Sequence, residues 1–263
     1  MYHALLAHPG PSPHAVHIAA QLFEQQMAWL HAHRYEAITV AELHRRLTDS
    51  ELTPNTVVIT FDDGYLSLLT QATPVLSKYG FAATLFLTTG FVGLPEFPAS
   101  FAAAVPPGDR PLTWAEVREM HALGWNIQAH SCTHVPHAGL PAQQLRTELD
   151  ESKRLIQSNL GADVAFYAFP YGSYDRHTLQ ALHHANYRAG FSVHSGQVTP
   201  YHDLKRLPRV EMNTSCSLEV FESLVRTGHV SSAAQYRAWV RDGVFYFPVV
   251  KDTLQKVFKS LVN

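Results

Sequence analysis

Residues 56–65 constrain the fold of this chain more than any other stretch. Residues 56–60 are a continuous β-branched run, which is typical of a strand buried on both faces of a parallel sheet. The strand leads without a spacer into Asp62, Asp63 and Gly64. Because consecutive strand residues point to opposite faces, the two carboxylates can serve one site only if the backbone turns, which Gly64 permits. The pair suggests one metal ligand beside one base, whereas a surface Asp-Gly turn is the alternative.

Strand and helix patterns alternate along most of the chain. Apolar runs predict seven strands, at residues 36–40, 57–61, 82–87, 125–129, 164–169, 189–193 and 207–212. Capping signals and apolar residues at helical spacing predict helices at residues 22–30, 39–47, 73–80, 113–124, 141–160, 176–185 and 218–225. At 263 residues, this alternation favours an α/β fold with a parallel sheet closed, or nearly closed, into a barrel.

Polar segments follow three of these expected strands. Asp62-Asp63, His130-Ser131-Cys132-Thr133-His134 and Pro170-Tyr171-Gly172 all lie at strand carboxyl ends, where the chemistry of such barrels collects. With Asp63, the two histidines would form a common ligand set for catalytic Zn²⁺, although the same set suits non-haem iron and other divalent metals. The alternative is a pair of exposed loop histidines in a chain that has 17.

Composition and charge limit the classes of partner. The formal net charge of −2 gives no signature of polyanion binding, so we do not expect a nucleic-acid partner. Residues 1–9 have neither the basic region nor the long apolar region of a secretory signal. A cytoplasmic location is therefore the default expectation, with action outside the cytoplasm as the alternative. The uncharged apolar run at residues 79–95 is broken by three glycines, and we expect no membrane span.

Two motifs together resemble a known family. Thr60-Phe61-Asp62-Asp63-Gly64, followed by His130-Ser131-Cys132-Thr133-His134, resembles the first two motifs of the polysaccharide deacetylase family, which is carbohydrate esterase family 4 with the NodB-homology domain. Pro170-Tyr171-Gly172 resembles the end of the third motif. Met1-Tyr2-His3, with the helical patterns after it, resembles the branch that contains bacterial poly-N-acetylglucosamine deacetylases.

The resemblance covers roughly residues 1–212. It implies a distorted (β/α) barrel and metal-dependent hydrolysis of an N-acetyl group on N-acetylhexosamine units of a polysaccharide or oligosaccharide. We expect a single domain over residues 1–263, in which residues 213–263 form a helical extension with no assigned role.

The resemblance also implies a role for each site residue. Asp62 would be the general base, while Asp63, His130 and His134 would hold one divalent ion, for which Zn²⁺ is the first choice and Co, Ni or Fe are alternatives. Pro170 and Tyr171 would contact the substrate, with the Tyr171 backbone N–H holding the oxyanion. Ser131 would support the ligands by a hydrogen bond. His3 would protonate the leaving amine.

Two departures from the family pattern affect the base and the acid. The family arginine that tethers the base, two residues before the proline of motif three, is Ala168 here. We hypothesise that Arg209 orients Asp62 instead; an ordinary structural arginine is the alternative. The late acid histidine of the common branch has no clear counterpart, which leaves His3, for which a frayed terminus is the alternative.

Two other functions stay open. One keeps the metal site but acts on a small amide, or on a nucleotide- or lipid-linked amino sugar. The other is a non-catalytic carbohydrate-binding relative. Intact Asp62, Asp63, His130 and His134 argue against the binding protein, because a binding site has no need of a base beside a metal.

Overall fold

A curled parallel sheet forms the centre of the molecule. The computed structural model describes residues 1–7, 14–102 and 105–228. Six strands pair in chain order, and every neighbouring pair is parallel: β3 (Glu36–Ile38), β4 (Thr56–Asp63), β5 (Ala83–Leu87), β6 (Asn126–Ala129), β7 (Phe166–Ala168) and β8 (Ala189–Phe191). A short parallel pair, β1 (Leu5–Leu6) and β2 (Ile18–Ala19), precedes the sheet. The distorted (β/α) barrel that the sequence indicated is confirmed.

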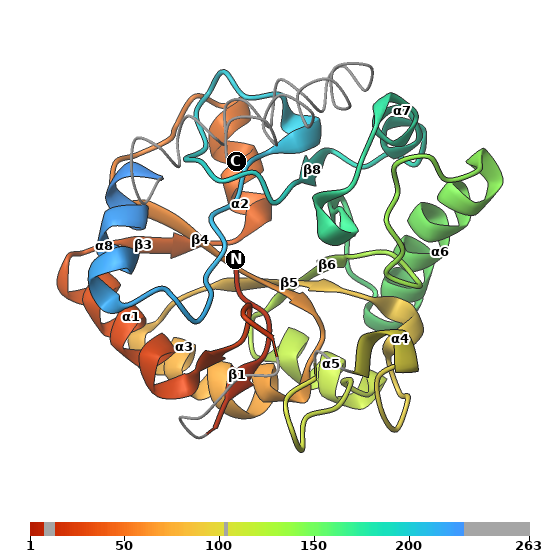
Figure 1. Ribbon diagram of the computed structural model, residues 1–263. Helices are drawn as coiled ribbons and strands as arrows, with labels where there is room; N and C mark the ends of the chain where they lie inside the picture. The colour runs from red at the N-terminus through yellow and green to blue at the C-terminus, as the bar shows by residue number, and fades with distance from the viewer. Residues whose placement is uncertain (8–13, 103–104, 229–263) are drawn as a thin grey trace, which may run out of the picture.

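Helices surround the sheet (Figure 1). They are α1 (Ala20–Ala32), α2 (Val40–Thr48), α3 (Thr73–Tyr79), α4 (Ala99–Ala102), α5 (Trp114–Ala122), α6 (Ala142–Leu160), α7 (Arg176–His184) and α8 (Leu218–Thr227). The expected caps are present: the Thr39 side chain accepts from the Glu42 N–H, and Thr113 and Glu116 form a complete capping box. Each such cap stabilises its helix by about 1 kcal/mol.

Strand residues are buried on both faces, which explains their unbroken apolar runs. In β5, Leu85 packs in the cluster between the sheet and the helices, whereas the next residue, Phe86, packs in a second cluster inside the curl. The rings of Phe86 and Phe191 lie 5.2 Å apart although β6 and β7 separate their strands in the sheet. The sheet must therefore curl far enough to bring β5 and β8 face to face.

The expected seventh strand, residues 207–212, is not a strand, and this prediction was wrong. Leu207 makes one parallel bridge to Phe191 at the end of β8. Pro208 follows, and proline has no N–H with which to continue a ladder. The curled sheet therefore has six strands rather than seven.

Irregular backbone spans the gap between β8 and β4. The amino group of Met1 donates to the Val210 carbonyl at 2.8 Å, and the Met212 N–H donates to the Met1 carbonyl at 2.9 Å. Next, the Tyr2 N–H donates to the carbonyl of Thr60 at 2.8 Å, and the Tyr2 carbonyl accepts from the N–H of Asp62 at 3.0 Å. The start of the chain thus lies beside the last residues of β4, the half of that strand that β3 does not pair.

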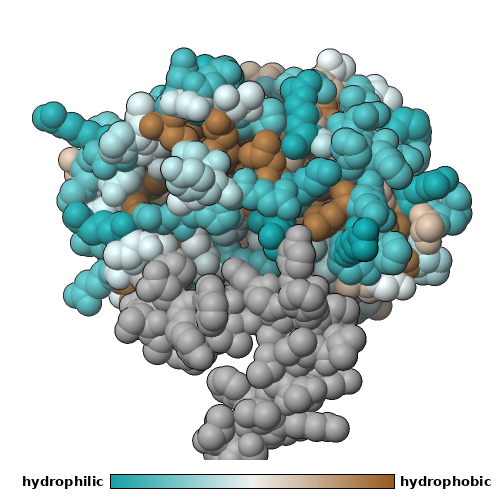
Figure 2. Space-filling model, turned by 90° about the horizontal axis from the view of Figure 1, so that it is seen from above, coloured by the Kyte–Doolittle hydropathy of each residue, from teal (hydrophilic) through white to brown (hydrophobic). Residues whose placement is uncertain are grey.

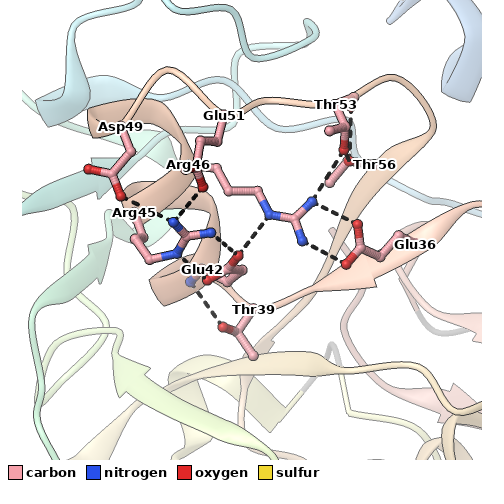
Figure 3. Close-up of polar contacts among 9 residues, drawn as sticks. All are labelled: Glu36, Thr39, Glu42, Arg45, Arg46, Asp49, Glu51, Thr53 and Thr56. Carbon is pink, nitrogen blue, oxygen red and sulfur yellow. Dashed lines mark hydrogen bonds and ion pairs between the residues drawn. The ribbon is translucent and has the colours of Figure 1, made fainter.

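Ion pairs on the surface connect α2 to its neighbours (Figure 3). Arg46 contacts Glu36 of β3 at 2.6 Å and Glu42 at 2.8 Å. Arg45 contacts Glu42, Asp49 and Glu51. Exposed pairs of this kind are individually weak and are screened by salt. We therefore attribute the stability of the fold to the two apolar clusters rather than to this network.

Polar residues cover most of the described surface in the view of Figure 2, with smaller hydrophobic patches between them. The exposed large apolar side chains of the described residues are Leu94, Leu123, Tyr171 and Tyr201. Within the same ranges, every helix is too short or too polar to cross a membrane. Tyr171 is the member of this group that follows a sheet strand at its carboxyl end.

Candidate active site

Asp63, His130 and His134 converge at the carboxyl ends of β4 and β6. Each offers one ligand atom, and these atoms all lie within 4.8 Å of one another. The Nε2 atoms of His134 and His130 lie 3.2 and 3.6 Å from Asp63 Oδ1. All three side chains are buried, and no other group of three potential ligands of this type occurs in the described part of the chain.

The hydrogen bonding and protonation of these side chains suit the binding of a divalent cation. Asp63 Oδ1 is buried and accepts no hydrogen bond, an arrangement that is unfavourable unless a cation compensates the charge. His130 Nδ1 lies 2.8 Å from the Ala168 carbonyl. This contact requires the proton on Nδ1 and leaves the lone pair of Nε2 facing Asp63.

Backbone turns explain how neighbouring residues reach one site. Asp63 has a φ of 76°, and Gly64 follows with a φ of 103°. The turn at Asp63 itself, and not only at Gly64, brings its carboxylate beside that of Asp62. Ser131 and His134 also have positive φ values, 70° and 58°. Such conformations are uncommon for residues other than glycine, and they concentrate at functional sites.

Arg209 contacts Asp62 through both terminal nitrogens of its guanidinium. Nη1 donates to Oδ1 at 2.7 Å and Nη2 donates to Oδ2 at 2.8 Å, a bidentate arrangement that fixes the plane of the carboxylate. Arg209 Nε also donates to the Ser192 carbonyl at 3.0 Å. Arg209 therefore makes the contact to Asp62 that the resemblance would assign to an arginine at position 168.

Opposing effects set the charges of the buried groups. Burial would raise the pKa of Asp62, but the positive charge and hydrogen bonds of Arg209, together with the nearby histidines, hold that pKa below its usual value. Burial likewise acts against ionisation of Asp63, but the charge of His134, with smaller contributions from His3 and His130, keeps the pKa of Asp63 low. Burial lowers the pKa of His130 to about 4, against the attraction of Asp62. The site thus has two carboxylates and, at His130, a neutral imidazole.

His3 lies next to the two carboxylates rather than at a frayed end. It follows Tyr2, whose carbonyl accepts from Asp62, and its charge would lower the pKa of both Asp62 and Asp63. The next residue, Ala4, donates its N–H to Nδ1 of buried His17 at 3.2 Å, which anchors the segment. His3 Nδ1 is buried and has no hydrogen-bond partner.

Tyr171 and Ser131 complete the set predicted from the sequence. Tyr171 lies in the 3-10 turn Pro170–Gly172 directly after β7, and Pro170 is buried. The Tyr171 ring meets the His134 ring edge-on at 4.6 Å and is 61% exposed, so it borders the site on the solvent side. Ser131 Oγ accepts from the His134 N–H at 2.9 Å.

The sequence analysis missed Glu148 of α6, which contacts the loop between the two histidines. The spacing of Leu145, Leu149, Ile156 and Leu160 predicts the inward face of this helix; the first three are buried and Leu160 is half-buried. Glu148 lies three residues after Leu145, on the same face. A charged residue on an otherwise apolar helix face was the available signal.

Comparisons with known proteins agree with the fold and with the family that the motifs resemble. The family model described as polysaccharide deacetylase matches residues 49–190. YxkH of Bacillus subtilis (strain 168), which is named as a polysaccharide deacetylase, is 28% identical over 228 residues, covering 86% of this chain and 75% of that protein. The poly-beta-1,6-N-acetyl-D-glucosamine N-deacetylase of Staphylococcus epidermidis is 26% identical over 220 residues, covering 80% of this chain and 71% of that protein.

A solved structure gives the same result. The Streptococcus pyogenes deacetylase PplD, in complex with acetate, matches with a TM-score of 0.75 and 26% identity, covering 87% of this chain and 96% of that chain. The family model spans more than half of the present sequence. On this evidence the chain belongs to the polysaccharide deacetylase family, which implies that it is an amide hydrolase.

Proposed function

We propose that this protein is a metal-dependent deacetylase that removes N-acetyl groups from N-acetylhexosamine units of a polysaccharide or oligosaccharide. One observation carries the proposal. The buried group of Asp63, His130 and His134 adjoins Asp62, a second carboxylate that Arg209 keeps ionised and oriented. A protein that only binds carbohydrate needs no oriented base beside a metal site.

Each side chain has a distinct task in the proposed reaction. A divalent ion held by Asp63, His130 and His134, with Zn²⁺ as the first choice, would supply a Lewis acid for the acetyl carbonyl and the attacking water. Asp62 takes the proton of that water, and Arg209 keeps its carboxylate aimed at the site.

The remaining groups act on the oxyanion and the leaving group. The Tyr171 backbone N–H donates to the oxyanion that forms from the carbonyl. His3 gives its proton to the nitrogen of the sugar, so that acetate and a free amine leave. The half-buried position of His3 beside Asp62 and Asp63 supports this assignment.

The choice of glycan rests on the relatives. The Staphylococcus epidermidis enzyme is named for poly-beta-1,6-N-acetyl-D-glucosamine. We therefore propose a β-1,6-linked N-acetylglucosamine chain as the first substrate to test.

Acetate release tests the proposed function. β-1,6-linked and β-1,4-linked N-acetylglucosamine oligomers and a sugar nucleotide are offered separately, with and without a chelator. We expect release from the β-1,6 oligomers, its loss after chelation and its recovery on adding Zn²⁺. Release from the sugar nucleotide alone would point to a small substrate. A purified protein with neither stoichiometric metal nor chelator-sensitive release would point to a binding protein.

A further inference from the structure

The loop between the two ligand histidines donates hydrogen bonds to one buried carboxylate. Glu148, on α6, is 2% exposed. Its Oε2 accepts from the backbone N–H groups of Cys132 and Thr133, both at 2.9 Å. Its Oε1 accepts from the Thr133 hydroxyl at 2.6 Å. All three donors belong to residues that lie between His130 and His134 in the chain.

The donors of the loop compensate the burial of Glu148. Within the described residues, no lysine, arginine or histidine forms an ion pair with this carboxylate. Burying an ionised carboxylate is unfavourable unless hydrogen bonds replace its water, and bonds to a charged acceptor are the strong ones. The loop and Glu148 therefore stabilise each other, and neither can move without breaking the three bonds.

The opposite side of the loop is fixed by a second contact. The Thr89 N–H donates to the Ser131 carbonyl at 3.0 Å, and the Gly90 N–H donates to the Cys132 carbonyl at 2.9 Å. Glu148 thus accepts hydrogen bonds from N–H groups of the loop, whereas the turn at Thr89–Phe91 donates hydrogen bonds to the carbonyl groups of the loop. A loop with two positive φ values needs such support on both sides to keep one conformation.

We propose that Glu148 is a positioning residue for the metal site. By fixing the backbone at Cys132 and Thr133, it holds the rings of His130 and His134 where their Nε2 atoms face Asp63. The affinity for a divalent ion therefore depends on a side chain that does not touch the ion. This inference rests on the proposed function, in that it assumes a metal on Asp63, His130 and His134.

Zn²⁺ affinity, measured by competition with a chromophoric chelator, tests the proposal without reference to catalysis. Glu148→Ala should weaken Zn²⁺ binding about 10- to 100-fold, the range found when groups that orient metal ligands are removed. Glu148→Gln should retain most of the affinity, because its amide oxygen can still accept from both backbone N–H groups.

Ser152→Ala is the matched control. Ser152 is buried on the same helix, and its hydroxyl donates to the carbonyls of Glu148 and Leu149 without touching the loop. It should lower the unfolding temperature of the metal-free protein yet leave Zn²⁺ affinity unchanged. Thr133→Val, which removes one donor to Glu148, should weaken Zn²⁺ binding measurably, by up to about tenfold. This variant tests the proposal if Glu148→Ala fails to fold.

The outcomes separate the two proposals. Parent-like Zn²⁺ affinity in Glu148→Ala or in Thr133→Val would overturn the positioning role, as would an equal loss of affinity in Ser152→Ala. Failure of the parent protein to bind Zn²⁺ would instead overturn the metal site, and the role of Glu148 with it.

Discussion

Arg209 donates two hydrogen bonds to Asp62, at 2.7 and 2.8 Å, across a separation of 147 residues in the chain. The contact forms because residues 207–212 and the first residues of the chain fill the gap between β8 and β4. The segment that failed to become a strand thus delivers the arginine that the third motif lacks.

Replacing Arg209 should change how the rate of the reaction depends on pH in the acid range. In Arg209→Ala the pKa of Asp62 should rise, because burial then acts without the opposing charge and hydrogen bonds of Arg209. The acid limb of the kcat/KM profile should move to higher pH. The free energy of unfolding should fall by about 3–5 kcal/mol, since a buried carboxylate is left unpaired. Arg209→Lys keeps the charge and should move the limb less. An unchanged rate and profile in Arg209→Ala would exclude the orienting role.

Replacing His3 should affect turnover but not metal binding. His3→Gln removes the proposed proton donor, so kcat should fall by about 10²–10⁴-fold while the metal content stays at the parent level. His121→Gln, at an exposed position on α5, is the control and should keep the parent rate. A parent-like kcat in His3→Gln would assign protonation of the amine to another group.

Gly90 should tolerate no side chain. A Cβ there would lie 2.3 Å from the carbonyl oxygen of Cys132, a backbone atom that cannot rotate away. Gly90→Ala should displace the ligand loop, weaken Zn²⁺ binding and cost about 1–3 kcal/mol of stability. Gly196→Ala is the control: its new Cβ would lie 3.5 Å from the nearest neighbouring atom, so Zn²⁺ binding and stability should stay at the parent level. Chelator competition and urea unfolding measure both effects, and parent-like Zn²⁺ binding in Gly90→Ala would contradict the expected displacement.

His137 should make the fold sensitive to mild acid. Its Nδ1 donates to the Val135 carbonyl, its Nε2 accepts from the Tyr167 hydroxyl, and burial lowers its pKa to about 4 from 6.5. Because the folded state favours neutral His137, its contribution is complete above pH 6.5 and is lost as the pH falls from 6.5 to 4. Since one pH unit between the two values is worth about 1.4 kcal/mol, the loss should reach about 3 kcal/mol.

Urea unfolding at several pH values measures this contribution. His137→Gln should show a flatter dependence of the unfolding free energy on pH between 4 and 6.5 than the parent protein. Parallel curves for the two proteins would show that His137 does not titrate in the expected range.

The parts of the fold that rest on local signals were predictable. The β-branched run of β4 and the capping residues Thr39 and Thr113 specify a buried strand and two helix starts from neighbouring residues alone. Asp63, His130 and His134 were predictable as a group because the carboxyl ends of parallel strands meet at one edge of the sheet.

The parts that depend on distant contacts were not predictable. Residues 207–212 are apolar enough for a strand, but Pro208 interrupts the ladder, and only the tertiary structure shows the N-terminal segment pairing there instead. The apolar helix face around Glu148 indicates that this residue is buried, but only the tertiary structure shows that its partner is the loop after β6. The positive φ of Asp63 could not be read from residue type, since glycine is the usual residue for such a conformation.

The division of labour between Asp62 and Asp63 is the central claim, and one paired measurement tests it most directly. The metal content and the rate of acetate release from a β-1,6-linked N-acetylglucosamine oligomer are determined for Asp62→Asn and Asp63→Asn. Asp62→Asn should retain one divalent ion per chain and release acetate about 10²–10⁴-fold more slowly than the parent. Asp63→Asn should lose the ion and the activity together. Acetate release at the parent rate by Asp62→Asn would contradict the account.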